Sequence, residues 1–169
     1  MPIVALGFAV APVAGQNFGA RLGHRVRATF RIAAILAVSG MACFVAVCQI
    51  FPDDLIRVFS TDPEVVAVGD EYLRVVSWNY IAAGLVFVTS SMFQAMGNTK
   101  PSLVTSLIRA VVVAIPTLLL ARLPGFHLAW VWYLTVVSVT LQMAIGLWLL
   151  NREYRVRLGP FEAPPHVEP

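Results

Sequence analysis

The chain has 169 residues, of which 59% are hydrophobic and 12% charged, with a formal net charge of +3. An ordinary soluble domain has about 45–50% apolar and about 25% charged residues. A soluble globule of this length needs a charged exterior that so few charges cannot supply. The composition therefore excludes an ordinary soluble protein and indicates that lipid surrounds part of the chain.

Long stretches with few or no charges recur along the chain, separated by short charged segments. A spanning helix needs about 20 mostly apolar residues, which these stretches supply. The sequence therefore predicts an all-α integral membrane protein, with one domain over residues 1–158 and a disordered, Pro-rich tail over residues 159–169. About five transmembrane helices are expected, at residues 2–20, 28–51, 64–96, 102–121 and 127–150.

The segment before the third helix contains residues that are typical of a helix start. Asp62, Pro63 and Glu64 predict a helix start, with an N-cap, a proline and an acid in the first turn. Residues 53–59 are expected to form a short amphipathic piece at the outer surface. The third helix is then expected to begin above the membrane and to continue into it.

The sign of the charge alternates from one loop to the next. Four arginines follow the first stretch between residues 21 and 31, six acidic residues lie between 53 and 71, and arginines follow the last stretch. Because Lys and Arg are enriched in cytoplasmic loops, this pattern predicts a multi-pass protein of the cell (inner) membrane. Its N-terminus is expected outside and its C-terminus in the cytoplasm.

The first apolar stretch is not a signal peptide, because the first charge, Arg21, follows it instead of preceding it. Met1 is therefore interpreted as an internal or secondary start within a longer chain. Cys43 and Cys48 lie about 140° apart around a helix, so a disulfide or metal site is not expected. Motifs of soluble enzymes are absent from the sequence. We expect no enzyme activity, catalytic residue, metal site, cofactor or nucleic-acid partner.

Three segments resemble the multidrug and toxic compound extrusion (MATE) family. Residues 15–20, Gly-Gln-Asn-Phe-Gly-Ala, are similar to the family signature that ends a helix before a basic loop. Residues 59–65 resemble the outer loop between the ninth and tenth helices. Residues 93–101, followed by Arg109 and Pro116, resemble the junction of the tenth and eleventh helices.

This resemblance implies a twelve-helix transporter of two six-helix lobes that exports organic cations or amphipathic drugs in exchange for sodium ions or protons. The chain would form the C-terminal part, about helices eight to twelve, with membrane lipid, drugs and a missing N-terminal lobe as partners. The acid that the family commonly uses for coupling lies in that missing lobe, and residues 75–99 contain no Asp or Glu. Two alternatives stay open: a lipid or oligosaccharide flippase of related fold, and a truncated product that does not transport.

Polar side chains in the third and last helices are candidates for substrate binding, because lipid does not tolerate them unpaired. Hydrogen bonds between helices are the alternative interpretation. The candidates, joined by aromatic or Met surface, are Asn79, Tyr80, Gln94 and Gln142.

A second set of residues is interpreted as conformational or structural. Prolines would kink helices, glycines allow close packing or turns, and polar groups at a helix end cap carbonyls or take part in the conformational cycle. Arg109 either extends to the cytoplasmic interface or contacts substrate or lipid. The set comprises Pro12, Gly15, Gln16, Asn17, Gly19, Gly97, Asn98, Pro101, Arg109 and Pro116.

Overall fold

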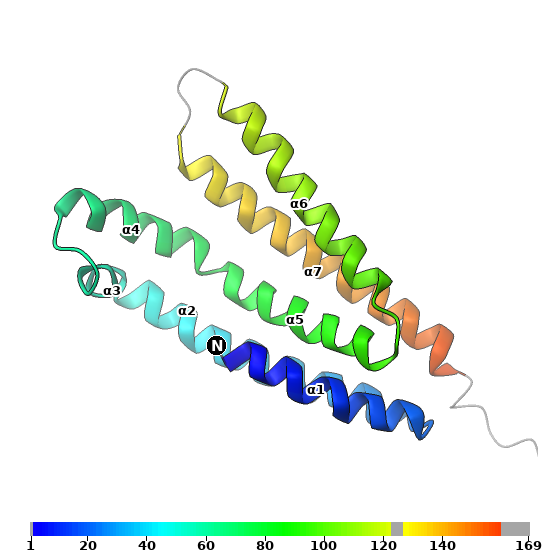
Figure 1. The fold of residues 1–169 in the computed structure, drawn as a ribbon. Coiled ribbons are helices and arrows are strands. Elements are labelled where there is room, and N and C mark those ends of the chain that lie inside the picture. Colours follow the sequence, from blue (N-terminus) through cyan, green and yellow to red (C-terminus); the bar gives the residue numbers. More distant parts are fainter. Residues whose placement is uncertain (1, 123–126, 160–169) are drawn as a thin grey trace, which may run out of the picture.

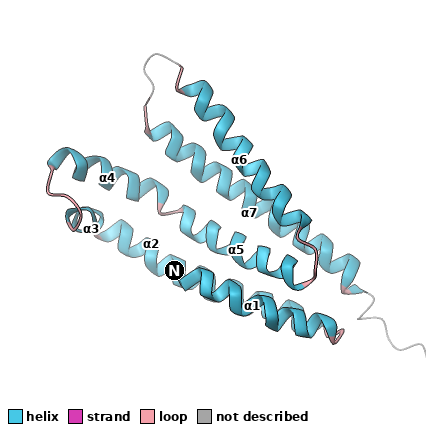
Figure 2. Ribbon diagram, in the orientation of Figure 1, coloured by secondary structure: helices cyan, strands magenta, loops and turns pink. Residues whose placement is uncertain are grey.

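The computed structural model describes residues 2–122 and 127–159, and every regular element in this part is an α-helix (Figures 1 and 2). The predicted all-α class is therefore confirmed for the described residues. Most of the tail predicted to be disordered lies outside them. The helices are α1 (Pro2–Gly19), α2 (Gly23–Ile50), α3 (Pro52–Arg57), α4 (Pro63–Val76), α5 (Asn79–Ala95), α6 (Lys100–Leu120) and α7 (Ala129–Arg157).

The described helices follow the order of the five expected spans, but only three or four of them qualify as spans by length and composition. By length and composition, α2, α6 and α7 can each cross a membrane, and α4 and α5 together form a fourth, bent candidate. The first candidate, α1, is a shorter apolar helix. It begins alongside the middle of α2 (Figure 1).

The third expected span differs from the prediction, because it is not one continuous helix over residues 64–96. It consists of α4 and α5, which are bent by 48° at Ser77 and Trp78. In a continuous helix the carbonyl oxygen of Arg74 would accept from the amide of residue 78. Here it accepts from Gln49 Nε2 of α2 at 2.9 Å. A side chain inserted into the helical hydrogen-bond ladder is a known cause of such kinks.

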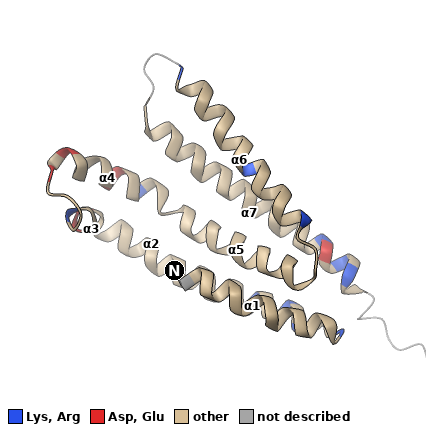
Figure 3. Cartoon of the chain, viewed as in Figure 1, with Lys and Arg blue, Asp and Glu red and all other residues tan. Residues whose placement is uncertain are grey.

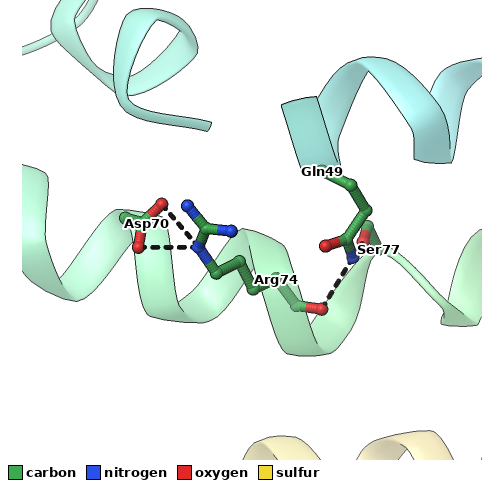
Figure 4. Close-up of polar contacts among 4 residues, drawn as sticks. All are labelled: Gln49, Asp70, Arg74 and Ser77. Atoms are coloured by element: carbon green, nitrogen blue, oxygen red, sulfur yellow. Dashed lines mark hydrogen bonds and ion pairs between the residues drawn. The ribbon is translucent and has the colours of Figure 1, made fainter. Parts of the chain in front are cut away.

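Gln49 holds the bend by a second hydrogen bond as well. Its Nε2 also donates to Ser77 Oγ at 2.9 Å, and Ser77 is fully buried (Figure 4). One turn earlier, Arg74 Nε lies 3.0 Å from both carboxylate oxygens of Asp70. The break is thus fixed by the last turn of another helix.

The segment before α4 folds as its sequence indicates. The short amphipathic piece is α3, and the Asp62 carboxylate accepts from the Glu64 amide at 3.0 Å, which caps α4. Pro63 takes the first helical position, where its missing N–H costs nothing. The predicted helix start is therefore confirmed.

The centre of the bundle is α5, which packs against α1 and α2 on one side and α7 on the other (Figure 1). Val88, Met92 and Phe93 of α5 are fully or almost fully buried in the core. The remaining long helix, α6, packs along α7 and makes few contacts with α5. This arrangement leaves room between α5 and α6.

Charges gather at the two ends of the bundle. The acidic residues of α3 and α4 lie at one end, and the basic residues of the α1–α2 turn and the end of α7 lie at the other (Figure 3). Arg109 lies within α6, nine residues after Lys100 at the start of that helix. The acidic and basic segments that alternate along the sequence therefore lie at opposite ends of the bundle.

Candidate functional site

A pocket of about 310 Å³ lies between α5, α6 and α7. The α5 residues that line it recur at helical spacing and so form one stripe facing the other two helices. The polar lining residues come from all three helices and include two amides, three hydroxyls and one guanidinium. The lining comprises Ala83, Val86, Phe87, Ser90, Ser91, Gln94, Ser106, Arg109, Val139 and Gln142.

Hydrogen bonds between helices frame this pocket. The hydroxyls of Ser90 on α5 and Ser102 on α6 are 2.8 Å apart, near the turn that joins the two helices. Deeper along α6, Ser106 Oγ accepts from Gln142 Nε2 of α7 at 3.3 Å. These bonds join α5 to α6 and α6 to α7, and Ser90, Ser106 and Gln142, which make them, also line the pocket.

Three residues singled out in the sequence therefore meet at one place: Gln94, Gln142 and Arg109. Gln142 is 4% exposed, and its Oε1 has no hydrogen-bond partner within the described residues. Gln94 and Arg109 are exposed. The pocket is thus lined by one cationic side chain, Arg109, and by a glutamine whose buried Oε1 has no partner within the described residues.

Asn79 and Tyr80 do not join this pocket. They begin α5, about 22 Å along the helix from Gln94 at 1.5 Å per residue. Tyr80 packs edge-on against Phe44 of α2, with ring centroids 5.4 Å apart. Asn79 is buried, and its Oδ1 lacks a partner within the described residues. The four predicted substrate-binding residues are therefore split: Asn79 and Tyr80 lie at the start of α5, whereas Gln94 of α5 and Gln142 of α7 line the pocket.

The turn between α5 and α6 is held by the end of α7. Gly97 has φ +70°, a conformation that favours glycine. Asn98 Nδ2 donates to Glu153 Oε1 at 2.9 Å, and Arg157 Nη1 donates to the Met96 carbonyl at 2.6 Å. An ion pair of 2.7 Å joins Arg157 Nε to Glu153. We call Met96, Asn98, Glu153 and Arg157 the turn clamp.

Sequence reasoning selected Gly97 and Asn98 but missed their partners. Arg157 is one of the arginines that follow the last apolar stretch, and the predicted helix ends at residue 150, before Glu153, whereas α7 continues to Arg157. The i, i+4 spacing of Glu153 and Arg157 was a signal of a helix that continues. Pro101, also selected, stands in the first turn of α6, where proline is favoured.

The residues selected in α1 have local roles in the structure. Asn17 Nδ2 donates to the Val13 carbonyl at 2.8 Å, and Gln16 is exposed. A Cβ added at Gly15 would meet the Ala95 carbonyl oxygen at 3.5 Å, whereas one at Gly19 would meet nothing within 4 Å.

The selected prolines interrupt neither helix, since α1 runs through Pro12 and α6 through Pro116. Both cysteines are free; Cys43 is exposed and Cys48 is buried. Within residues 2–122 and 127–159, no three His, Cys, Asp or Glu side chains come together as a metal site would require.

The comparisons with known proteins agree on one family. The MatE family model matches residues 1–120. The "Probable multidrug resistance protein YpnP" of Bacillus subtilis (strain 168) is 34% identical over 116 residues, which are 69% of this chain and 26% of that protein. The "Probable multidrug resistance protein YoeA" of the same strain is 24% identical over 149 residues, 86% of this chain and 32% of that protein.

The chain thus spans about a quarter to a third of the length of these two curated relatives. The matched region includes α1 to α6, and the longer alignment accounts for most of the chain. An all-helical bundle with apolar helices of spanning length is the architecture that a multi-pass transporter requires. This chain is therefore a multi-pass membrane protein and a member of the MATE family.

Proposed function

We propose that the chain is the C-terminal part, about helices eight to twelve, of a multidrug efflux antiporter that exchanges organic cations or amphipathic drugs for sodium ions or protons. The observation that carries this proposal is the family match over residues 1–120, together with relatives named as multidrug resistance proteins. The pocket between α5, α6 and α7 supports the amphipathic-drug part of this proposal, because it combines polar groups with apolar walls.

Transport requires more than this chain. Alternating access needs one bundle to rock against another around a site between them. The pocket described above has no acidic lining residue, whereas coupling needs a group whose occupancy by the ion differs between the two states. We therefore propose that an N-terminal lobe supplies both the second bundle and the coupling acid.

Drug accumulation in efflux-deficient cells tests this proposal. The chain alone is expected to leave accumulation unchanged, because it provides neither a second lobe nor a coupling acid. Co-expression with a separately encoded piece that carries the N-terminal half and the seventh helix of a MATE transporter is expected to lower accumulation severalfold in a sodium- or proton-dependent manner.

Two results would contradict the proposal. Ion-dependent lowering by the chain alone would show that its own polar groups suffice for coupling. Unchanged accumulation with the added half, at matched membrane abundance of both pieces, would favour a product that does not transport. Gln94→Leu in the co-expressed pair provides the site control, because it removes a pocket amide while keeping an apolar, helix-compatible side chain.

We further propose that the acidic end of the bundle faces outside the cell (inner) membrane and the basic end faces the cytoplasm. The separation of charge supports this orientation, because arginine and lysine are retained on the cytoplasmic side. The turn at Thr99 would then be cytoplasmic and the loop at Thr61 external.

Cysteine labelling of intact cells checks the orientation. In a background that carries Cys43→Ala and Cys48→Ala, Thr61→Cys is expected to react with a membrane-impermeant maleimide from outside. Thr99→Cys is expected to react only after permeabilisation. Both positions are exposed, which makes them suitable for labelling. Labelling of both from the same side contradicts the orientation.

A further inference from the structure

Arg109 supplies the only formal charge among the residues that line the pocket between α5, α6 and α7. It stands nine residues into α6, about 14 Å along the helix from Lys100. Within the described residues no carboxylate lies at ion-pair distance from its guanidinium. An unpaired cation at this depth is costly, so a negative group that entered the pocket would be stabilised there.

Gln142 contributes a hydrogen-bond acceptor that has no partner within the described residues. Its side chain is 4% exposed and donates to Ser106 Oγ, while its Oε1 has no partner within the described residues. A buried carbonyl oxygen of this kind calls for a donor. Ser106 lies one turn before Arg109 on the same face of α6, so Gln142 and the guanidinium border the same space.

We propose that this pocket binds an oxyanion, a carboxylate or phosphate, on an amphipathic molecule that also carries an N–H or O–H group close to the acid. The oxyanion accepts charge-assisted hydrogen bonds from Arg109, and the neighbouring N–H or O–H donates to Gln142 Oε1 once that oxygen, which is covered in this structure, turns toward the pocket. Val86, Phe87 and Val139 provide apolar walls for the rest of the molecule. A purely cationic group is disfavoured beside Arg109, because like charges repel in a medium of low dielectric constant.

This inference rests on the proposed function in treating Gln94 and Gln142 as ligand-binding residues. It concerns binding by the chain itself, so its test does not depend on export, on coupling or on a second lobe. If the chain binds the oxyanion but the co-expressed pair exports nothing, the inference is supported and the transport proposal is contradicted. Export with no oxyanion binding would overturn the inference and leave the transport proposal standing.

Three fluorescent probes distinguish the contact with Arg109 from the hydrogen bond to Gln142. Their binding is measured with the purified full chain in uncharged detergent micelles. Dansylglycine carries the carboxylate and a sulfonamide N–H, dansylsarcosine carries the carboxylate with that N–H methylated, and dansylglycinamide has no charge. The expected order of affinity is dansylglycine, then dansylsarcosine a few-fold weaker, with the amide about tenfold weaker than dansylglycine because it lacks the charged contact. Titrations with empty micelles give the background.

Variants assign these differences to residues. Arg109→Gln is expected to weaken dansylglycine binding about tenfold and to leave the amide unchanged. Arg109→Lys should fall between, since it keeps the charge but loses the planar fork. Gln142→Leu should equalise dansylglycine and dansylsarcosine. Lys100→Gln is the matched control, because it removes a charge from the same helix outside the pocket lining.

Two sources of the oxyanion are distinguished by native mass spectrometry with phosphatidylglycerol or phosphatidylcholine. Arg109-dependent phosphatidylglycerol adducts that dansylglycine displaces identify a lipid headgroup. Arg109-dependent dansylglycine binding without such adducts identifies an acidic soluble ligand. The inference is overturned if the wild-type chain binds dansylglycine and its amide equally, if it binds neither probe, or if Arg109→Gln weakens both probes alike.

Discussion

Gly7→Leu is expected to destabilise the bundle by about 2 kcal/mol, because α1 crosses α5 there with no room for a side chain. A Cβ at Gly7 would lie 2.5 Å from Phe87 Cδ1 and 2.9 Å from Ser91 Oγ. Replacing glycine within a helix gains up to about 1 kcal/mol of helix propensity, while overpacking costs about 1–3 kcal/mol and a leucine extends far beyond Cβ. The steric cost therefore exceeds the gain. Unfolding by SDS in mixed micelles measures the difference.

Gly40→Leu is the matched control, since it adds the same side chain to a helical glycine whose Cβ would meet nothing within 4 Å. It is expected to leave the free energy of unfolding unchanged or slightly increased. Phe87→Ala makes space at the crossing, so it should lower the free energy of unfolding less in the Gly7→Leu background than in the wild-type chain. Equal effects of Gly7→Leu and Gly40→Leu would contradict the close approach of α1 and α5.

Arg157→Ala is expected to lower the free energy of unfolding by about 2 kcal/mol, which is the range for hydrogen bonds to charged groups. The substitution removes the ion pair to Glu153 and the hydrogen bond to the Met96 carbonyl. The Glu153 side chain is only 16% exposed, so water replaces the guanidinium poorly and Asn98 is left as its partner. The same unfolding assay in mixed micelles reports the loss.

Arg155→Ala is the control for the turn clamp, because Arg155 is an exposed arginine in the same last turn. It is expected to change stability by less than about 0.5 kcal/mol. In a double-mutant cycle, Arg157→Ala should cost less when Glu153→Ala is already present, because the two side chains are coupled. Strictly additive effects, or equal losses from Arg155→Ala and Arg157→Ala, would contradict the turn clamp.

Local chemistry made much of the fold predictable. The order of the long helices follows from where charges interrupt apolar runs, and the start of α4 follows from Asp62 and Pro63, which act on their own helix. Gly97 at the α5–α6 turn is likewise a local requirement for positive φ. In each of these cases the cause lies within a few residues of its effect.

The bend between α4 and α5 could not be predicted in this way. Neither Ser77 nor Trp78 is a helix breaker, and the bend depends on Gln49, which lies 28 residues before Ser77. The small residues at Gly7, Ala11, Gly15 and Gly19 repeat at every fourth position, a pattern of close helix packing. That pattern is visible in the sequence, yet only the structure identifies Gly7 as the position where an added side chain would collide with α5.

The site was predictable only in part for the same reason. Lipid exclusion selected polar residues within spans, and this criterion found Gln94 and Gln142. It could not distinguish them from Asn79 and Tyr80, because the position of a residue along α5 decides which helices it meets. The pocket depends on α6 packing along α7 rather than along α5, and no local feature of α6 encodes that choice.

The turn clamp also sets an order of events during synthesis. Glu153 follows Asn98 by 55 residues and Arg157 follows Met96 by 61. The α5–α6 turn is therefore synthesised well before the α7 residues that hold it. Until α7 is complete, the α5–α6 turn has only contacts of its own helices, such as the Ser90–Ser102 hydrogen bond. A chain that terminates after Arg152 would retain nearly all of α7 but would lack Glu153 and Arg157, and so would never form the turn clamp.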